Sequence, residues 1–360
     1  MFFWRGKMKI TDVFSCEIEP MDRRSFLKFS GILGFGMASA GIIPMTAEAV
    51  RFNKKLYKVS ETRLAMGTFV SMTLIHHNKD QAEEAMGMAF LEIHRLTGLL
   101  NRFDDKTAVA QLNKDGYLND IPPEMTEVVA AALHYHQMSQ GAFDITVKPL
   151  VDLFEEKLGG KNQLFPTQKE MKQALDLVGS QKIRLEKRKM LFQKPGMGIT
   201  LDGIAKGYVV DQVSQLLSKH EIEKHLINAG GDIRTRGAKG DNRPWKVAIE
   251  DPSKTKNYPD IIQMRDGAVA TSGNYEIFYD REKMFHHIVD PSSGLSPDFK
   301  NSVSVRADTT MEADALSTSV FVMTPEKGVE FMNALPRVEG LVVAKDGTLL
   351  KSRGWKSAAK

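Results

Sequence analysis

The sequence predicts an α+β fold, and three observations indicate it. The chain has 360 residues, of which 42% are hydrophobic and 26% charged, the balance of a globular domain that folds in water. Segments with the period of strands and segments with the period of helices are mixed without strict βαβ alternation, which favours α+β. The mean hydropathy is −0.28 and a single apolar stretch, residues 29–45, stands out. A protein with several membrane spans is therefore excluded.

The first half of the domain begins with a strand and continues mostly as helices. Residues 68–77 alternate and are rich in β-branched side chains, which predicts a strand. Apolar residues at helical spacing then predict helices over residues 80–100, capped by Asp80, over 126–140, over 168–177, capped by Thr167, and over 207–217.

The second half is richer in strands. Short apolar runs predict strands over residues 225–228, 245–250, 268–271, 286–289 and 302–307. Helical spacing returns over residues 311–322 and 325–334. The last two strands, 340–344 and 348–352, flank Lys345-Asp346-Gly347, and Asp-Gly between two apolar runs predicts a hairpin turn.

The charge balance argues against nucleic-acid binding, and the cysteine content excludes cysteine-based cross-links and metal sites. The 49 basic residues nearly balance the 45 acidic ones, which is too even for the positive surface that nucleic-acid binding requires. The single cysteine, Cys16, lies before the apolar stretch, so the domain has no disulfide and no cysteine zinc site. A metal would have to be held by oxygen atoms or histidine.

The N-terminus has the pattern of an export signal. Arg23-Arg24 and Ser-Phe-Leu-Lys precede an uncharged run that ends near Ala47-Glu48-Ala49, a small-residue cleavage site. Adjacent arginines in this context resemble the twin-arginine signal. We therefore expect an extension and signal over residues 1–49, a single domain over residues 50–360, and a periplasmic location. An uncleaved signal would instead associate the protein with the inner membrane.

Three glycine-containing segments are candidates for ligand contact. Gly141–Leu150 contains Asp144, either a turn residue or a carboxylate facing a ligand. Leu201–Tyr208 places glycines and Lys206 before a helix, which suits phosphate binding but also a tight strand-to-helix turn. Gly230-Gly231-Asp232 is similarly a tight turn or a close backbone approach to a ligand.

Two further patterns involve titratable side chains. His286 and His287 precede Asp290, an arrangement that fits a general base oriented by a carboxylate as well as a solvent-facing pair. Asp314 and Thr318 are four residues apart on a predicted helix, so their oxygens can share one hard cation. Two such ligands suit Mg²⁺, which keeps water and takes substrate phosphate. The alternative is a capping Asp and a Thr bonded to its own helix.

Together and in this order, these segments resemble the ApbE family of FAD:protein FMN transferases. The pieces are Met66-Gly67-Thr68, Gly141–Leu150, Leu201–Tyr208, Gly230-Gly231-Asp232, Ala270-Thr271-Ser272-Gly273, His287–Pro291 and Ala313–Thr318. The resemblance spans about residues 62–335, nearly the whole predicted domain. It implies one T-fold-like mixed α/β domain with a smaller subdomain or insertions.

The resemblance also implies the reaction and the site. FAD is the substrate, Mg²⁺ bridges its pyrophosphate, and the FMN half moves onto a Thr or Ser hydroxyl of an acceptor flavoprotein while AMP leaves. The implied metal ligands are Asp314, Thr318 and Gly203, the last through its carbonyl. The implied flavin contacts are Met66, Ala142, Phe143, Asp144, Thr200, Asp202, Lys206, His287 and Ile288.

Attack of a hydroxyl on a pyrophosphate needs neutralised charge and a proton acceptor. We expect His287 to be the base, oriented by Asp290, with Asp144 as the competitor. Met66 with Phe143 or Tyr275 would line an apolar slot for the flavin ring. Two other activities stay open: a Mg²⁺-dependent FAD pyrophosphatase, in which water replaces the hydroxyl, and a flavin-binding protein without turnover.

Overall fold

The computed structural model describes residues 43–358 except 54, 160–163, 241, 253–257 and 275–285. The predicted signal up to residue 42 and the predicted flavin contact Tyr275 lie outside the described residues. Within the described part of the chain, no helix is both long and apolar enough to span a membrane.

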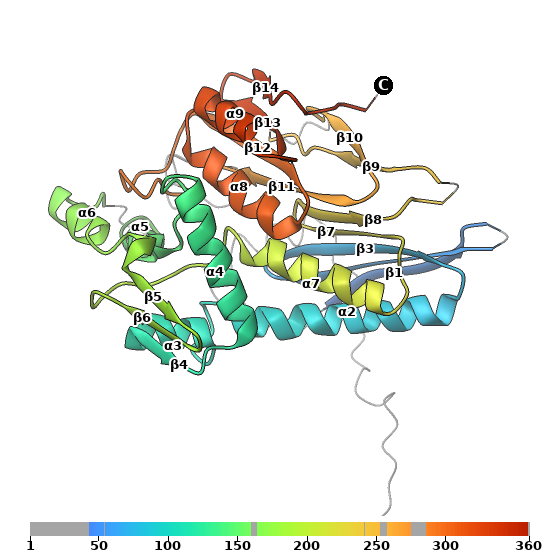
Figure 1. The fold of residues 1–360 in the computed structure, drawn as a ribbon, viewed down its shortest axis with the longest axis horizontal. Helices are drawn as coiled ribbons and strands as arrows, with labels where there is room; N and C mark the ends of the chain where they lie inside the picture. Colours follow the sequence, from blue (N-terminus) through green and yellow to red (C-terminus); the bar gives the residue numbers. More distant parts are fainter. Residues whose placement is uncertain are drawn as a thin grey trace, which may run out of the picture. The chain divides into compact units, whose positions relative to one another are not determined.

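Within the described residues, the main sheet has nine strands in the order β1-β2-β3-β7-β8-β11-β12-β13-β14, and all neighbours are antiparallel (Figure 1). The strands are β1 (Ile43–Arg51), β2 (Tyr57–Ala65), β3 (Thr68–His76), β7 (His225–Ala229), β8 (Asp232–Arg236), β11 (Gly267–Gly273), β12 (Lys300–Ala307), β13 (Glu339–Ala344) and β14 (Leu349–Lys351). Short turns connect β1 to β2, β2 to β3, β7 to β8 and β13 to β14, and helices lie in the connections from β3 to β7 and from β12 to β13.

Four helices cover one face of this sheet (Figure 1). They are α2 (Lys79–Leu100), α7 (Ala205–Lys219), α8 (Thr310–Val322) and α9 (Pro325–Ala334). The apolar faces of these helices and of the sheet form the main core, in which Phe90, Tyr208 and Phe321 are the largest buried side chains. Burial of this apolar surface provides most of the stability of the domain.

The opposite face of the sheet is covered by a hairpin of β9 (Trp245–Ala248) and β10 (Ile261–Met264). Because side chains alternate along a strand, Ile233 of β8 and Val269 of β11 point to this hairpin and form a separate apolar cluster with Val247 and Met264. The sheet is therefore covered on both faces near β8 and β11.

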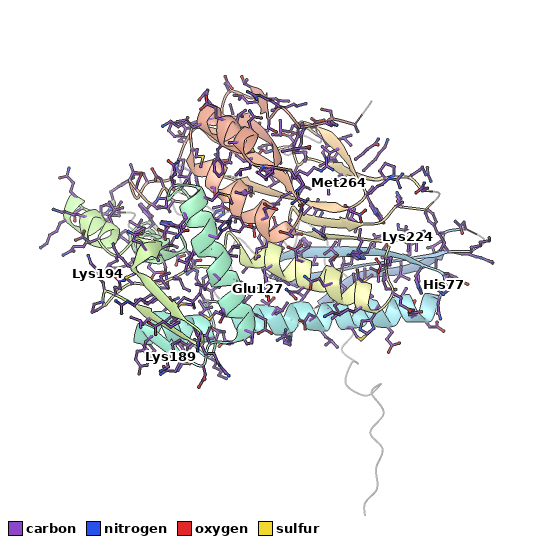
Figure 2. All side chains as sticks on the ribbon, in the orientation of Figure 1. His77, Glu127, Lys189, Lys194, Lys224 and Met264 are labelled. Carbon is purple, nitrogen blue, oxygen red and sulfur yellow. The ribbon has the colours of Figure 1, made fainter. Side chains whose placement is uncertain are left out.

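Residues 101–200 form the smaller, mainly helical part. It contains α3 (Ala108–Asp115), α4 (Pro123–Met138), α5 (Lys148–Leu158), α6 (Gln168–Leu175), the 3₁₀ turns η2 (Ile145–Val147) and η3 (Ser180–Lys182), and a sheet of β4 (Tyr117–Asn119), β6 (Lys189–Phe192) and β5 (Ile183–Glu186). Glu127 of α4, labelled in Figure 2, accepts a hydrogen bond from the Tyr208 hydroxyl of α7 at 2.9 Å. This contact joins α4 to the main body.

Most predicted elements are present, with three corrections. Asn78 rather than Asp80 caps α2, since its side chain accepts the N–H groups of Asp80 and Gln81. The predicted strand over residues 286–289 is wrong, because residues 287–289 lie in a loop. The strand predicted over residues 245–250 ends at Ala248.

Strand β1 contains the predicted cleavage site. Ala47, Glu48 and Ala49 pair with Glu61, Ser60 and Val59 of β2, so a domain that begins at residue 50 would keep only the last two residues of β1. The predicted boundary at residue 49 stays a prediction, but cleavage there would turn β2 into the edge strand of the sheet.

Removal of β1 should therefore lower stability. We expect a chain of residues 50–360 to unfold at a midpoint temperature several degrees below that of residues 43–360, because β2 loses its hydrogen-bonded neighbour. Differential scanning calorimetry of the two chains measures the difference. Equal midpoints would contradict a stabilising role for β1.

Candidate active site

The β2–β3 turn presents Met66 at its tip. Met66 has φ +52° and Gly67 has φ +71°, so both residues of this two-residue turn are left-handed. A methionine in this region is unfavourable and is retained only where its surroundings require it. Thr68 follows and lies against Gly230, where a Cβ would be 2.5 Å from Thr68 Oγ1. The β2–β3 turn and the β7–β8 turn are therefore in contact.

The β7–β8 turn is tight and holds a buried charge beside it. Gly230 and Gly231 have φ +61° and +99°, conformations that favour glycine. Asp232, the next residue, is 1% exposed, and its Oδ2 lies 3.3 Å from Lys206 Nζ. Lys206 is in the first turn of α7, so the predicted phosphate-binding cation and the glycine turn come together.

The loop before α7 is attached to the segment around Asp144. The Thr200 N–H donates to the Ile145 carbonyl at 2.8 Å. A Cβ on Gly203 would be 3.4 Å from the Phe143 ring and 3.0 Å from Thr318 Oγ1. Three segments distant in sequence thus meet at Gly203, as the resemblance implies.

Asp144 is buried and accepts hydrogen bonds from its own surroundings. It receives the backbone N–H groups of Thr146 at 2.7 Å and Ser180 at 2.9 Å, both of their hydroxyls, and His136 Nδ1 at 3.2 Å. Burial opposes its ionisation, but hydrogen bonds led by that from His136 outweigh burial and lower its pKa. A carboxylate with this many donors is a weak base, so the geometry favours a structural role for Asp144 over the predicted catalytic one.

His136 was not expected from the sequence. Its hydrogen bond to Asp144 raises its pKa above the ordinary value, despite partial burial. The charged pair stabilises the fold in two parts. The part from the raised pKa of His136 is fully present below about pH 6.5, the pKa of an unfolded histidine, and is lost as the pH rises through the pKa of His136 in the folded protein. The part from Asp144 is lost instead in acid, as the pH falls through its lowered pKa.

Replacement of His136 should therefore cost more at low than at high pH. We expect the difference in free energy of unfolding between the wild type and His136→Gln to be larger at pH 6 than at pH 9, measured by urea denaturation. His134→Gln, an exposed neighbour on α4, is the control and should show no such difference. A difference that does not change with pH would contradict the charged pair.

A group of oxygen atoms surrounds the middle of α8. Asp314 is 4% exposed, and its Oδ2 accepts the Gly207 N–H at 3.1 Å. One turn later Thr318 Oγ1 lies 3.3 Å from Ser272 Oγ of β11, beside Gly203. The sequence prediction that Asp314 and Thr318 lie on one helix face near Gly203 agrees with this arrangement.

These oxygens fit a small hard cation. Carboxylate, hydroxyl and backbone carbonyl are the ligand types that Mg²⁺ takes, with substrate phosphate and water completing its shell. Because Gly203 has no side chain, its backbone can lie close to Thr318, where a Cβ would be 3.0 Å from the hydroxyl oxygen. Among the described residues no group of three or more His, Cys, Asp or Glu could hold a metal ion, so a metal would depend on this mixed oxygen set.

Asp202 is engaged elsewhere. Its Oδ2 lies 3.2 Å from Arg102 Nε, and the same guanidinium contacts Glu155 at 3.3 Å. The Arg102 side chain is 8% exposed although its partners are more open, so it anchors the loop that carries Gly203. The predicted contact of Asp202 with FAD stays a prediction, and the geometry gives its carboxylate a positioning role.

The two adjacent histidines have different surroundings. His286 is 2% exposed, its Nδ1 accepts the Ile288 N–H, and its Nε2 therefore donates to the Pro297 carbonyl at 3.0 Å. His287 is partly exposed, although its Nδ1 is buried, so it is the more accessible histidine of the two. The Asp290 carboxylate accepts hydrogen bonds from Ser292 and Ser293 in its own turn, and these bonds fix its position. The predicted role of Asp290 in orienting His287 stays a prediction.

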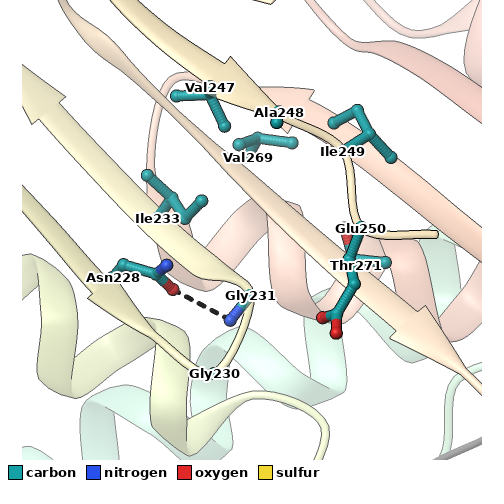
Figure 3. Close-up of a pocket in the computed structure, with 10 residues that line it drawn as sticks. All are labelled: Asn228, Gly230, Gly231, Ile233, Val247, Ala248, Ile249, Glu250, Val269 and Thr271. Carbon is teal, nitrogen blue, oxygen red and sulfur yellow. Dashed lines mark hydrogen bonds between the residues drawn. The ribbon is translucent and has the colours of Figure 1, made fainter. Parts of the chain in front are cut away.

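A small cavity lies on the face of β11 that points away from α8 (Figure 3). It has a volume of about 80 Å³ and is lined by the Gly230-Gly231 turn, by apolar side chains of β8, β9 and β11, and by Glu250 and Thr271. Ser272, the next residue after Thr271, points instead to α8. The cavity and the oxygen group are thus separated by one strand.

The sequence did not single out Ser272, Arg102 or His136. Ser272 belongs to the motif Ala270–Gly273, and the alternation of Ala268, Ala270 and Ser272 on one strand face is the signal that could have placed it opposite a helix. Arg102 and His136 carry no such signal, because their carboxylate partners are distant in sequence.

Comparison with known proteins agrees with this geometry. The model of the ApbE family matches residues 66–342. The FAD:protein FMN transferase of Haemophilus influenzae is 30% identical over 242 residues, covering 64% of this chain and 70% of that protein. The enzyme of the same name from Escherichia coli K12 is 28% identical over 304 residues, covering 81% and 85%.

Solved structures share the fold. The ApbE protein of Thermotoga maritima superposes with a TM-score of 0.76 at 28% identity, covering 82% of this chain and 97% of that one. The flavin transferase ApbE of Vibrio cholerae gives a TM-score of 0.73 at 25% identity, covering 86% and 98%. The mixed α/β fold with its large antiparallel sheet is common to them. With the family model matching residues 66–342 and the motifs around Gly203, Ser272 and Asp314 in contact, this chain belongs to the ApbE family.

Proposed function

We propose that this chain is an FAD:protein FMN transferase that depends on Mg²⁺. The observation that carries the proposal is the convergence of Asp314, Thr318 and Gly203 at the N-terminal end of α7, where Lys206 adds a positive charge. Hard oxygen ligands beside a positive charge suit a pyrophosphate. The names of the relatives agree with this substrate.

The residues divide the work of binding. Asp314 and Thr318 would hold the metal with the Gly203 carbonyl, and a bound Mg²⁺ would neutralise charge on the pyrophosphate oxygens. Lys206 is paired with buried Asp232 at 3.3 Å and would contact the same substrate group. Met66, held in a strained turn and partly exposed, offers apolar surface to the flavin ring, whereas the predicted contact Phe143 is 3% exposed and packs beside Gly203.

The transfer forms one bond and breaks one. The acceptor hydroxyl oxygen bonds to the phosphorus of the FMN half, the bond from that phosphorus to the AMP oxygen breaks, and AMP leaves. We assign His287 as the base that takes the hydroxyl proton, because it is more exposed than His286. The competitor Asp144 already accepts several hydrogen bonds and is a weaker base. Ala142, Thr200 and Ile288 would line the substrate.

The proposed acceptors are flavoproteins of extracytoplasmic electron transport that carry a Thr or Ser flavinylation motif. The twin arginines Arg23 and Arg24 and the following uncharged run support export to the periplasm. If the signal stays uncleaved, the protein would associate with the inner membrane.

The test is to incubate the protein with FAD, Mg²⁺ and a candidate acceptor domain and to follow AMP and the mass of the acceptor. We expect an FMN-sized mass gain with equimolar AMP, and loss of both on addition of EDTA.

Other outcomes identify the alternatives. AMP and free FMN without a mass gain, repeated with several acceptors, would indicate a pyrophosphatase. Tightly bound intact FAD without AMP would indicate a flavin-binding protein. A mass gain that survives EDTA would reject the metal requirement while leaving the transfer.

A further inference from the structure

Three hydroxyl groups form a chain of hydrogen bonds beside the proposed metal ligands. Thr318 Oγ1 lies 3.3 Å from Ser272 Oγ, and Ser272 Oγ lies 2.7 Å from Ser317 Oγ. Ser317 Oγ in turn donates to the Asp314 carbonyl at 3.0 Å. Ser317 is fully buried, so this end of the chain is shielded from water.

The end of this chain fixes its direction. The backbone carbonyl oxygen of Asp314 can only accept, so Ser317 donates its single hydroxyl proton to it. Ser317 must then accept from Ser272, and Ser272, having used its proton, must accept from Thr318. The Thr318 hydroxyl therefore donates into the protein, and its lone pairs are directed away from Ser272.

We infer that Ser272 is a positioning residue that makes Thr318 a metal ligand. A cation needs the lone pairs of a hydroxyl and is repelled by its proton, so a hydroxyl whose proton is held by another group is the better ligand. Partners of metal ligands typically contribute 10–100-fold to metal affinity. The inference rests on the proposed metal site at Asp314 and Thr318.

A matched control lies on the opposite face of β11, the strand that carries Ser272. Thr271 and Ser304 are cross-strand neighbours on β11 and β12, and their hydroxyls lie 2.8 Å apart. Ser304→Ala removes one hydroxyl from such a pair and leaves the hydrogen bonds among Thr318, Ser272 and Ser317 unchanged.

The experiment measures binding of Mn²⁺, as the probe, to the full chain in the presence of FAD. Free Mn²⁺ is followed by its EPR signal, and binding to FAD alone is subtracted. We expect Ser272→Ala to raise the dissociation constant of Mn²⁺ about 10-fold or more. Ser317→Ala should weaken binding less, because Ser272 can then turn its proton toward Thr318. Ser304→Ala should leave the constant within about 2-fold, and the unfolding temperatures of all variants are measured beside it.

The outcomes distinguish failure of the inference about Ser272 from failure of the proposed metal site. Wild-type affinity in both Ser272→Ala and Ser317→Ala would overturn the inference while leaving the metal site intact. Equal weakening in Ser304→Ala would also overturn it, since the effect would then be general. If the wild type itself binds no Mn²⁺, the proposed metal site fails and the inference with it.

Discussion

Replacement of Asp314 by asparagine is expected to lower the rate of FMN transfer about 10³-fold at millimolar Mg²⁺. Asp314 is the only carboxylate among the three proposed metal ligands, so the variant loses the negative charge that attracts the cation. The measurement is the rate of mass gain of the acceptor as a function of Mg²⁺ concentration.

The substitution is chosen to keep the fold. Asparagine has nearly the shape of aspartate, and its side-chain carbonyl can still accept the Gly207 N–H that Asp314 accepts at 3.1 Å. We therefore expect the unfolding temperature to change little. A loss of activity with an unchanged unfolding temperature would assign the effect to the charge.

Glu312→Gln is the matched control. Glu312 lies in the first turn of the same helix and has no place among the proposed ligands, so the same change from carboxylate to amide should keep the rate within about 2-fold. Asp314→Asn with the wild-type rate at limiting Mg²⁺ would remove Asp314 from the metal site.

The sequence located the candidate site better than it described its individual carboxylates. Asp314 and Thr318 could be placed on one helix face because helical spacing alone sets their separation. Asp144, Asp202 and Asp290 have the same chemical group, but their roles depend on which donors surround them. Those donors, such as His136 for Asp144 and Arg102 for Asp202, come from distant segments, so no local pattern reports them.

The limits of the fold prediction have a similar cause. Helices α8 and α9 could be bounded closely because their apolar period and caps are local. Strand β1 could not, because residues 43–51 also have the composition of a signal's end and become a strand only by pairing with β2. Residues 286–289 are apolar enough for a strand, yet His286 bonds to the loop carbonyl of Pro297 instead of to a neighbouring strand.

The second large effect is expected at Gly207, where α7 crosses α8 at close range. A Cβ there would lie 2.4 Å from the Thr310 carbonyl oxygen and 2.7 Å from the Met311 Cα, both backbone atoms that cannot rotate away. Gly207→Ala must therefore separate the two helices. The same separation stretches the hydrogen bonds from Thr310 and Met311 N–H groups to Asp211, which cap α8.

We expect Gly207→Ala to lower the free energy of unfolding by about 3 kcal/mol, measured by urea denaturation. The matched control is Gly87→Ala, also inside a helix but with no atom within 4 Å of the added Cβ. There alanine should stabilise by about 0.5–1 kcal/mol, because it restricts the unfolded chain and favours the helix. Since Gly207 also donates to Asp314, its variant should bind Mn²⁺ more weakly even where it is folded, whereas Gly87→Ala should not. Equal stability of the two variants would mean that α7 and α8 do not pack at this distance, and the proposed metal site would then lose the contact that positions Asp314.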